Sequence, residues 1–503
     1  MSELNFTVQD RGLEYLGAAR IDGPLVVIER VRDVGFDEVV EILDPEGHPR
    51  VGRVLDISGE QAVIQVLEGT TGLSNQSLRA RFLGASFLLP VSRHMLGRVF
   101  DGLGRPADGG PPPLSADLRD VNGRPINPCA RRYPREFIQT GLSAIDGMNA
   151  LVRGQKLPMF SGNGLPHDRV AAQIVRQACL LEEQSAFSIV FAAMGVKHEV
   201  ADFFIRNFED SGALARVAMF LCLADAPSVE RLLTPRVALT AAEHLAFDCG
   251  QHVLVLLTDM TNYCESLREV GTARGEIPGR KGYPGYLYSD LASIYERAGR
   301  IEGSPGSITQ VAILTMPADD ISHPVPDLTG YITEGQIVLD RDLFQRAIYP
   351  PIAGLPSLSR LMKDGVGQGF TRDDHPALAS QLFACYAYVK KVRALADVIG
   401  EEELNALDRQ YMQFGEAFER RFLNQGEYEN RSIQTTLELG WDVLSMLPRD
   451  ELHRASDALV ESHYRKQAAQ QAEPGFQITP TSGEKSGLAR KSHATTRTQI
   501  PGL

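Results

Sequence analysis

The stretch KLPMFSGNGLPHDRVAAQIVRQ, at residues 156–177, has the order of a phosphate-binding loop. An apolar run is followed by a glycine-bearing turn and then by an amphipathic helical pattern. A loop of the form G-x-x-x-x-G-K-[ST] holds phosphates with backbone N–H groups, a Lys, and a Ser or Thr that binds magnesium. Counted from Gly162, however, the second Gly, the Lys and the hydroxyl positions are His167, Asp168 and Arg169. The sequence therefore predicts a phosphate loop that has lost its phosphate ligands.

Two residues of this loop act against phosphate directly. Pro166 removes one backbone donor, and Asp168 places a negative charge where a phosphate would lie. We expect nucleotide to bind there weakly or in an altered pose. The degenerate loop is assigned to Gly162, Gly164, His167, Asp168 and Arg169.

Two further segments bear on ATP chemistry. The apolar run HVLVLLTD ends in Asp259, and an Asp after such a strand supports magnesium in phosphate-loop NTPases, although many parallel strands end in Asp for structural reasons. The carboxylate that orients the attacking water is expected after the strand SIVFAAM, where the sequence has Val196. Because valine cannot polarise water, we expect no ATP hydrolysis by this chain alone.

Composition limits the class of protein. A length of 503 residues corresponds to about three domains at roughly 150 residues each. The net charge of -13, from 51 basic and 64 acidic residues, argues against a nucleic-acid partner. Six cysteines without a C-x-x-C pair predict reduced core residues and no metal site. We expect neither a signal peptide nor a membrane-spanning helix, so other subunits would have to cross any membrane involved.

The pattern along the chain predicts an α/β multidomain fold. Short β-branched runs separated by turns predict an N-terminal small β-barrel over residues 1–75. Apolar strands that alternate with helical patterns predict a central parallel sheet over residues 76–370, including a Pro/Gly-rich connector. Helical patterns follow over residues 371–470, and the aperiodic, Ser/Thr-rich residues 471–503 are expected to be disordered.

Several long motifs together resemble one protein family, the B, or regulatory, subunits of V/A-type rotary ATPases and ATP synthases. The resemblance extends from the N-terminal barrel to about residue 465. The motifs are REFIQTGLSAIDGMNALVRGQKLPMFSGNGLPHDRVAAQI, LTDMTNYCESLREV, PGRKGYPGYLYSDLASIYERAGR, PDLTGYITEGQIVLDRDL and LPSLSRLMKDGVGQGFTRDDH.

The resemblance implies a RecA-like nucleotide-binding domain and a non-catalytic subunit that alternates with a catalytic A subunit in a hexameric ring. ATP or ADP with Mg would bind at the interface with the catalytic subunit, and none tightly to this chain alone. A central rotor stalk and a peripheral stalk would connect the ring to a membrane sector that moves protons or sodium ions. The subunit would lie peripherally on the cytoplasmic side of the membrane.

The resemblance also assigns roles to particular residues. Arg360, in LPSLSRLMKDG, is implied to be an arginine finger that completes the A-subunit site. The glycine- and aromatic-rich residues 277–290 are implied to face the rotor, or else to be a packed loop without rotor contact. Tyr331 could contact nucleotide at the subunit boundary or lie in the core. Lys363 and Arg372 are interpreted as solvated or ion-paired surface charges.

Three functions remain to be compared. The first is a non-catalytic subunit that is essential for the rate of a rotary ATP synthase or ATPase. The second is a self-sufficient hexameric ATPase, which would need the intact loop that this sequence lacks. The third is a structural or regulatory scaffold with a vestigial pocket, in which Arg360 has no catalytic role.

Overall fold

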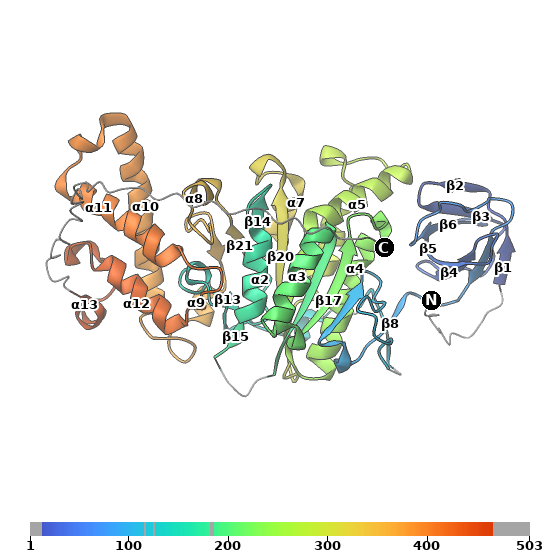
Figure 1. Ribbon diagram of the computed structural model, residues 1–503, viewed down its shortest axis with the longest axis horizontal. Helices are drawn as coiled ribbons and strands as arrows, with labels where there is room; N and C mark the ends of the chain where they lie inside the picture. Colours follow the sequence, from blue (N-terminus) through green and yellow to red (C-terminus); the bar gives the residue numbers. More distant parts are fainter. Residues whose placement is uncertain (1–12, 115–116, 124–125, 182–185, 466–503) are drawn as a thin grey trace, which may run out of the picture. The chain divides into compact units, whose positions relative to one another are not determined.

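The computed structural model describes residues 13–114, 117–123, 126–181 and 186–465. The described residues belong to one unit, within which a β-domain, an α/β domain and a helical domain follow one another along the chain (Figure 1). The predicted order of fold classes is therefore confirmed. The tail that we expected to be disordered lies outside the described residues.

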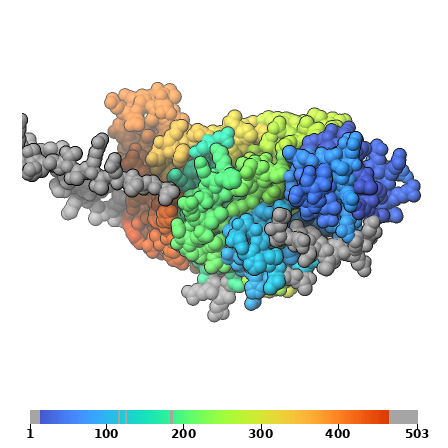
Figure 2. Space-filling model, turned by 45° about the vertical axis from the view of Figure 1, so that its right-hand side comes forward, coloured from blue at the N-terminus to red at the C-terminus, as the bar shows by residue number. Residues whose placement is uncertain are grey.

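The N-terminal domain is a seven-stranded antiparallel sheet, dark blue in Figures 1 and 2. Its strands are β1 (Leu13–Leu16), β2 (Arg20–Asp22), β3 (Leu25–Glu29), β4 (Val39–Leu43), β5 (Pro49–Ser58), β6 (Gln61–Val66) and β7 (Arg79–Phe82). Their order in the sheet is β1-β7-β4-β5-β6-β3-β2. Alternate residues, such as Val26 and Ile28 of β3, point into one core, as the period of two residues requires.

The barrel sheet extends beyond the boundary at residue 75 that we drew from the sequence. Strand β7 pairs with β1 and β4 and buries Ala80 and Phe82 in the barrel core. Its sequence RARF alternates Arg with these two apolar residues. An alternation of four residues is too short to predict a strand without its pairing.

The central domain contains a large sheet, most of it parallel. Its strands are β9 (Arg98–Asp101), β14 (Met159–Gly162), β16 (Phe187–Val196), β17 (Val217–Leu223), β18 (His252–Thr258), β20 (Ser307–Met316), β21 (Gly335–Val338) and β22 (Leu358–Ser359). The order is β22-β21-β14-β20-β18-β16-β17-β9, with β22 antiparallel at one edge. Smaller strands accompany it: β8 (Leu88–Pro90), β10 (Leu118–Asp120), β11 (Arg131–Arg132), β12 (Phe137–Gln139), β13 (Leu151–Val152), β15 (Cys179–Leu180) and β19 (Gly299–Ile301).

Helices cover both faces of this sheet, which explains why its strands are apolar without interruption. In β16, Ile189 and Phe191 pack with α2 (His167–Gln177) and α3 (His198–Asp210). Val190 and Ala192 pack on the opposite face with α4 (Ser228–Glu243) and α5 (Met260–Ala273). The remaining helices of this domain are α1 (Ser143–Asp146), α6 (Leu287–Tyr295), α7 (Pro324–Ile332), α8 (Arg341–Gln345) and α9 (Met362–Gly365).

The C-terminal domain consists of helices. They are α10 (His375–Ile399), α11 (Ala406–Ala417), α12 (Ile433–Leu444) and α13 (Asp457–His463). Their apolar residues, including Leu382, Phe414 and Trp441, belong to the same core cluster as α2 and α3. The helical domain therefore stabilises the sheet face that carries the phosphate-loop helix.

The cysteine prediction is partly wrong. All six cysteines are free, but Cys129 and Cys249 are exposed, whereas Cys222, Cys264 and Cys385 are buried. Cys129 lies in a short surface turn, and Cys249 directly follows the last turn of a helix, so neither reaches a core. In the described part of the chain, none of the helices combines the length and apolarity that crossing a membrane requires.

Candidate functional site

The predicted phosphate loop connects β14 to α2, as expected, but its backbone is folded against itself. Gly164 adopts the left-handed conformation, with φ of 79°. Leu165 donates its N–H to the Gly162 carbonyl at 3.1 Å, and His167 donates its N–H to the Leu165 carbonyl at 2.9 Å. Pro166 has no N–H. Three consecutive residues of the loop, 165–167, therefore have no free backbone N–H for a bound anion.

Two predicted acidic residues, Asp168 of the loop and Asp259, lie close enough to interact electrostatically. Burial raises the pKa of Asp168, His167 opposes this rise, and the Asp259 carboxylate adds to it. His167 Nε2 lies 3.6 Å from Asp168 Oδ1, and its Nδ1 lies 3.0 Å from Ser161 Oγ. A carboxylate thus replaces the cation that a phosphate would need.

Asp259 has an evident structural role. It begins α5 as the N-cap and accepts a hydrogen bond from the Thr261 N–H at 2.8 Å. It also accepts from the N–H of Thr315 at 3.1 Å and from the hydroxyl of the same residue. These contacts join the carboxyl ends of β18 and β20.

A second pair of residues covers the loop, and we did not predict it from the sequence. Asp319 follows β20, and Arg341 begins α8. Arg341 binds both carboxylate oxygens of Asp319, at 2.7 and 2.9 Å, and donates to the Asn163 carbonyl at 3.0 Å. A Cβ at Gly162 would lie 1.9 Å from Asp319 Oδ1, so only glycine fits beneath this pair. The one available signal in the sequence was an Asp pair shortly after the apolar run VAILTM.

Two other predicted residues lie near the loop without contributing a phosphate ligand. Arg169 is largely exposed and lies 3.9 Å from Glu427 of the helical domain. Val196 ends β16, and its apolar side chain occupies the position expected for a catalytic carboxylate. The structure thus holds the predicted loop residues together but supplies neither a phosphate-binding cation nor a water-activating base at these positions.

Arg360 lies at the other end of the sheet. It follows the edge strand β22, and its N–H donates to the Glu334 carbonyl at 2.9 Å. Glu334 directly precedes β21, which runs parallel to β14. Glu334, and Arg360 hydrogen-bonded to it, therefore lie at the level of Lys156, before β14 begins. Six residues of extended chain separate this level from Gly162, about 20 Å at roughly 3.3 Å per residue.

The backbone at Arg360 is held firmly while its side chain is free. The buried Ser359 hydroxyl accepts from Gln155 Nε2 at 2.9 Å and donates to the Ala150 carbonyl at 2.8 Å. Arg360 itself is exposed, and its guanidinium makes no hydrogen bond or ion pair within the described part of the chain. This is an anchored strand end that presents an unpaired cation.

The two neighbouring cations differ from each other. Arg372 binds both oxygens of the buried Asp374, at 2.5 and 2.8 Å, so its charge is used within the chain. Lys363 is exposed and, among the residues that the structure describes, makes no ion pair. Both fit the interpretation as solvated or ion-paired charges: Arg372 is ion-paired, and Lys363 is exposed, without an ion pair to the described residues.

Tyr331 does not lie in the core of this chain. On α7 its side chain is 73% exposed, which rules out the core interpretation. The same helix carries Asp327, which binds Arg280 at 3.1 Å. Lys281 binds Asp320 at 3.2 Å, so the loop of residues 277–290 is fixed to the segment after β20. Ile277, at its start, is 91% exposed.

An apolar groove lies beside Arg360. It has a volume of about 640 Å³ and is formed by β22, α9 and α10. Leu358 and Phe383 contribute exposed apolar side chains, and Lys363 and Arg454 contribute positive charge. The surface around Arg360 is therefore both apolar and basic.

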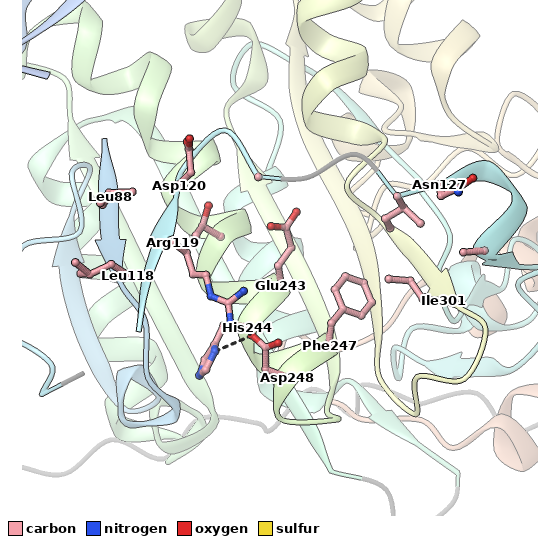
Figure 3. A pocket seen from close by; sticks show the side chains of 14 residues that line it. Leu88, Leu118, Arg119, Asp120, Asn127, Glu243, His244, Phe247, Asp248 and Ile301 are labelled. Carbon is pink, nitrogen blue, oxygen red and sulfur yellow. Dashed lines mark hydrogen bonds and ion pairs between the residues drawn. The ribbon is translucent and has the colours of Figure 1, made fainter. Parts of the chain in front are cut away.

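A different cavity, of about 500 Å³, lies between β10 and the end of α4 (Figure 3). Figure 3 shows Arg119, His244 and Asp248 side by side, with the His244–Asp248 contact of 3.0 Å dashed. Arg119 also binds Asp117, at 2.8 and 2.9 Å, and Asp248, at 3.1 Å. Because the Arg119 guanidinium already binds both carboxylates and places a positive charge between them, we assign no metal to this group.

Comparisons with known proteins agree with this architecture. The beta-barrel domain of the ATP synthase alpha/beta family matches residues 19–84, and the nucleotide-binding domain of the same family matches residues 141–359. The C-terminal domain of V and A type ATP synthase matches residues 364–464.

Individual relatives are similar over most of their length. The chain is 62% identical to V-type ATP synthase beta chain 2 of Treponema pallidum over 453 residues, which cover 90% of this chain and 94% of that protein. It is 61% identical to the V-type ATP synthase beta chain of Halothermothrix orenii over 452 residues, which cover 90% and 98%. The solved structure of an ATP synthase subunit, NeqB, from Nanoarcheaum equitans is 41% identical, with a TM-score of 0.67, covering 84% of this chain and all of that one. The chain belongs to the ATP synthase alpha/beta family and, within it, to the V-type ATP synthase beta chains, the B subunits of V/A-type ATPases.

Proposed function

We propose that this B subunit is non-catalytic and completes the ATP site of a neighbouring catalytic A subunit with Arg360. The observation that carries this proposal is the position of Arg360, which lies at the opposite end of the sheet from the degenerate loop. Its guanidinium has no hydrogen-bond or ion-pair partner among the described residues. A guanidinium is planar and permanently charged, so it can bind two phosphate oxygens as charge develops in the transition state.

The separation of about 20 Å along the strands supports action on a neighbour. Arg360 cannot reach the loop of its own chain across that length of sheet. In a head-to-tail ring, one end of each subunit meets the opposite end of the next. Each chain can then offer its arginine to an adjacent site while keeping its own loop for a second, altered interface.

The partners and the nucleotide follow from this arrangement. The A subunit would supply the intact phosphate loop and bind ATP or ADP with Mg, and this chain would contribute Arg360 and the apolar groove beside it. Residues 277–290, with exposed Ile277 and Tyr288, would face the central rotor stalk. The ring, with its peripheral stalk, would lie on the cytoplasmic side of the membrane and be coupled to proton or sodium transport.

The test is steady-state ATP hydrolysis by the complex assembled from this chain and its catalytic partner. Arg360→Ala is expected to lower kcat by about 10³-fold or more, with assembly unchanged and KM little affected. Lys363→Ala is the matched control, because it removes another exposed, unpaired cation three residues away. Near-normal turnover of the Arg360→Ala complex would contradict the proposal and favour the scaffold function.

A further inference from the structure

The register of β21 and β22 places a carboxylate directly opposite Arg360. Gly335 pairs with Ser359 and Gln336 with Leu358. One further step along the ladder aligns Glu334 with Arg360, and their backbones share the 2.9 Å hydrogen bond described above. Residues opposite each other on antiparallel strands have Cβ atoms about 4.5–5.5 Å apart, and opposite charges at such positions attract. An ion pair between Glu334 and Arg360 would therefore be the ordinary outcome.

The structure shows a different partner for Glu334. Lys156 donates its backbone N–H to Glu334 Oε2 at 2.7 Å, and its ammonium group lies 2.9 Å from Glu334 Oε1. The ammonium group also lies 2.9 Å from Glu296 Oε1. Lys156 is only 6% exposed, so its charge is fixed between the two carboxylates.

We propose that Lys156 is a positioning residue for Arg360: by binding Glu334, it prevents that carboxylate from capturing the Arg360 guanidinium. The inference rests on the proposed function of Arg360. The Lys156 ammonium group and backbone N–H each bind one oxygen of Glu334. Capture of Glu334 by Arg360 would leave Lys156 with one carboxylate fewer in a desolvated position. The guanidinium thus stays available for the phosphates of the adjacent site.

Loss of the Lys156 charge should release Glu334. Lys156→Met keeps an apolar stem of similar length but leaves Glu334 and Glu296 without their shared cation. Glu334 would then turn to the guanidinium opposite it. Because displacement of a catalytic group by about 1 Å can cost about 10²-fold in rate, an intramolecular ion pair at Arg360 should lower kcat strongly while KM changes little.

The experiment is a double-mutant cycle on ATP hydrolysis by the assembled complex. We expect Lys156→Met to lower kcat by about 10- to 100-fold, Glu334→Gln alone to be near normal, and Lys156→Met/Glu334→Gln to regain most of the activity. A neutral glutamine cannot form an ion pair with Arg360. Recovery of kcat in the double variant would therefore show that capture of Arg360 by Glu334 caused the loss. If Lys156 only stabilises the fold, the double variant will be no more active than Lys156→Met, and the inference is overturned.

A second variant tests capture without altering the buried lysine. Gln336 lies on the same face as Glu334, two residues along β21, and Lys156 does not bind it. Gln336→Glu places a new carboxylate on the diagonal from Arg360, about 7–8 Å between Cα atoms. We expect a reduced kcat that recovers at high salt, and full activity at low salt would overturn the capture mechanism even if Lys156→Met failed to assemble.

Arg360→Ala in the same assay separates the two proposals. If Arg360→Ala is as active as wild type, the proposed function fails, whatever the Lys156 variants do. If Arg360→Ala is impaired while Lys156→Met has normal kcat and KM, only the role of Lys156 is wrong.

Discussion

Arg360 and Glu334 are joined by a backbone hydrogen bond of 2.9 Å, yet the Glu334 carboxylate is bound by Lys156 and not by Arg360. The sequence interval between Lys156 and Arg360 spans most of the central domain, but the sheet brings both residues to one end of β14 and β22. The strand that leads into the degenerate loop therefore also fixes the surroundings of the free arginine. The loop is connected through β14 to Lys156, and the contacts of Lys156 with Glu334 lead from there to Arg360.

Gly335 should be needed for the position of Arg360. It has φ of 139°, and a Cβ there would lie 2.0 Å from the Leu358 carbonyl oxygen. Gly335→Ala is expected to displace β22, to destabilise the chain by about 1–3 kcal/mol, and to reduce ATP hydrolysis by the complex. Gly330→Ala on α7 is the control, because its Cβ would meet nothing closer than 3.9 Å. Thermal unfolding and kcat measured on both variants check the prediction, and normal values for Gly335→Ala would refute it.

Asp168 should weaken nucleotide binding at this chain's own loop. Asp168→Asn removes the negative charge that repels the phosphates of ADP. It should tighten ADP binding several-fold, on the order of 1 kcal/mol for one charge contact. Since burial raises the pKa of Asp168, wild-type affinity should increase as pH falls toward that raised pKa, whereas the affinity of Asp168→Asn should not. Titration of the isolated chain with a fluorescent ADP analogue measures both effects. Asp210→Asn, at the exposed end of α3, should bind like wild type, and equal affinities for all three proteins would contradict the prediction.

Glu419 should make the stability of the helical domain dependent on pH. Its buried carboxylate accepts hydrogen bonds from Arg346, Arg393 and Tyr386, at 2.6 to 3.1 Å. Burial raises the pKa of Glu419, but these donors outweigh burial and lower the pKa to about 2. Because the pKa is depressed in the folded state, the stabilisation is complete above pH 4.5 and is lost as pH falls toward 2.

Glu419→Gln is therefore expected to lower the free energy of unfolding by about 3 kcal/mol at pH 7, and by progressively less below pH 4.5. Denaturant unfolding of the isolated chain at a series of pH values provides the measurement. Glu416→Gln changes an exposed glutamate on the preceding turn and should have little effect at any pH. A stability difference between wild type and Glu419→Gln that does not vary with pH would show that the ion pairs are not its source.

Local patterns in the sequence were sufficient to predict the main fold. The short β-branched runs separated by turns indicated a barrel, and the uninterrupted apolar runs indicated a covered parallel sheet. The residues that depart from a phosphate-loop motif were also visible, because Pro166, His167 and Asp168 occupy fixed positions in a local motif. Each of these predictions depends on neighbours along the chain.

Contacts between distant segments could not be predicted in this way. Asp319 and Arg341 cover Gly162 from more than 150 residues away, and nothing in their own segments indicates that partner. The exposed Tyr331 is likewise ambiguous in sequence, since an aromatic residue in a helix suits a core as well as an interface. The pairing of Glu334 with Lys156, and not with Arg360, depends on three segments that only the folded sheet brings together.

The most direct measurement of the central claim is binding of ADP with aluminium fluoride, a mimic of the transferring phosphoryl group, to the assembled complex. We predict that Arg360→Ala will weaken binding of this mimic by about 10³-fold or more while ADP alone binds nearly as it does to wild type. That result would place the Arg360 guanidinium in the transition state of the neighbouring site. Equal affinity of the wild-type and Arg360→Ala complexes for the mimic would contradict it.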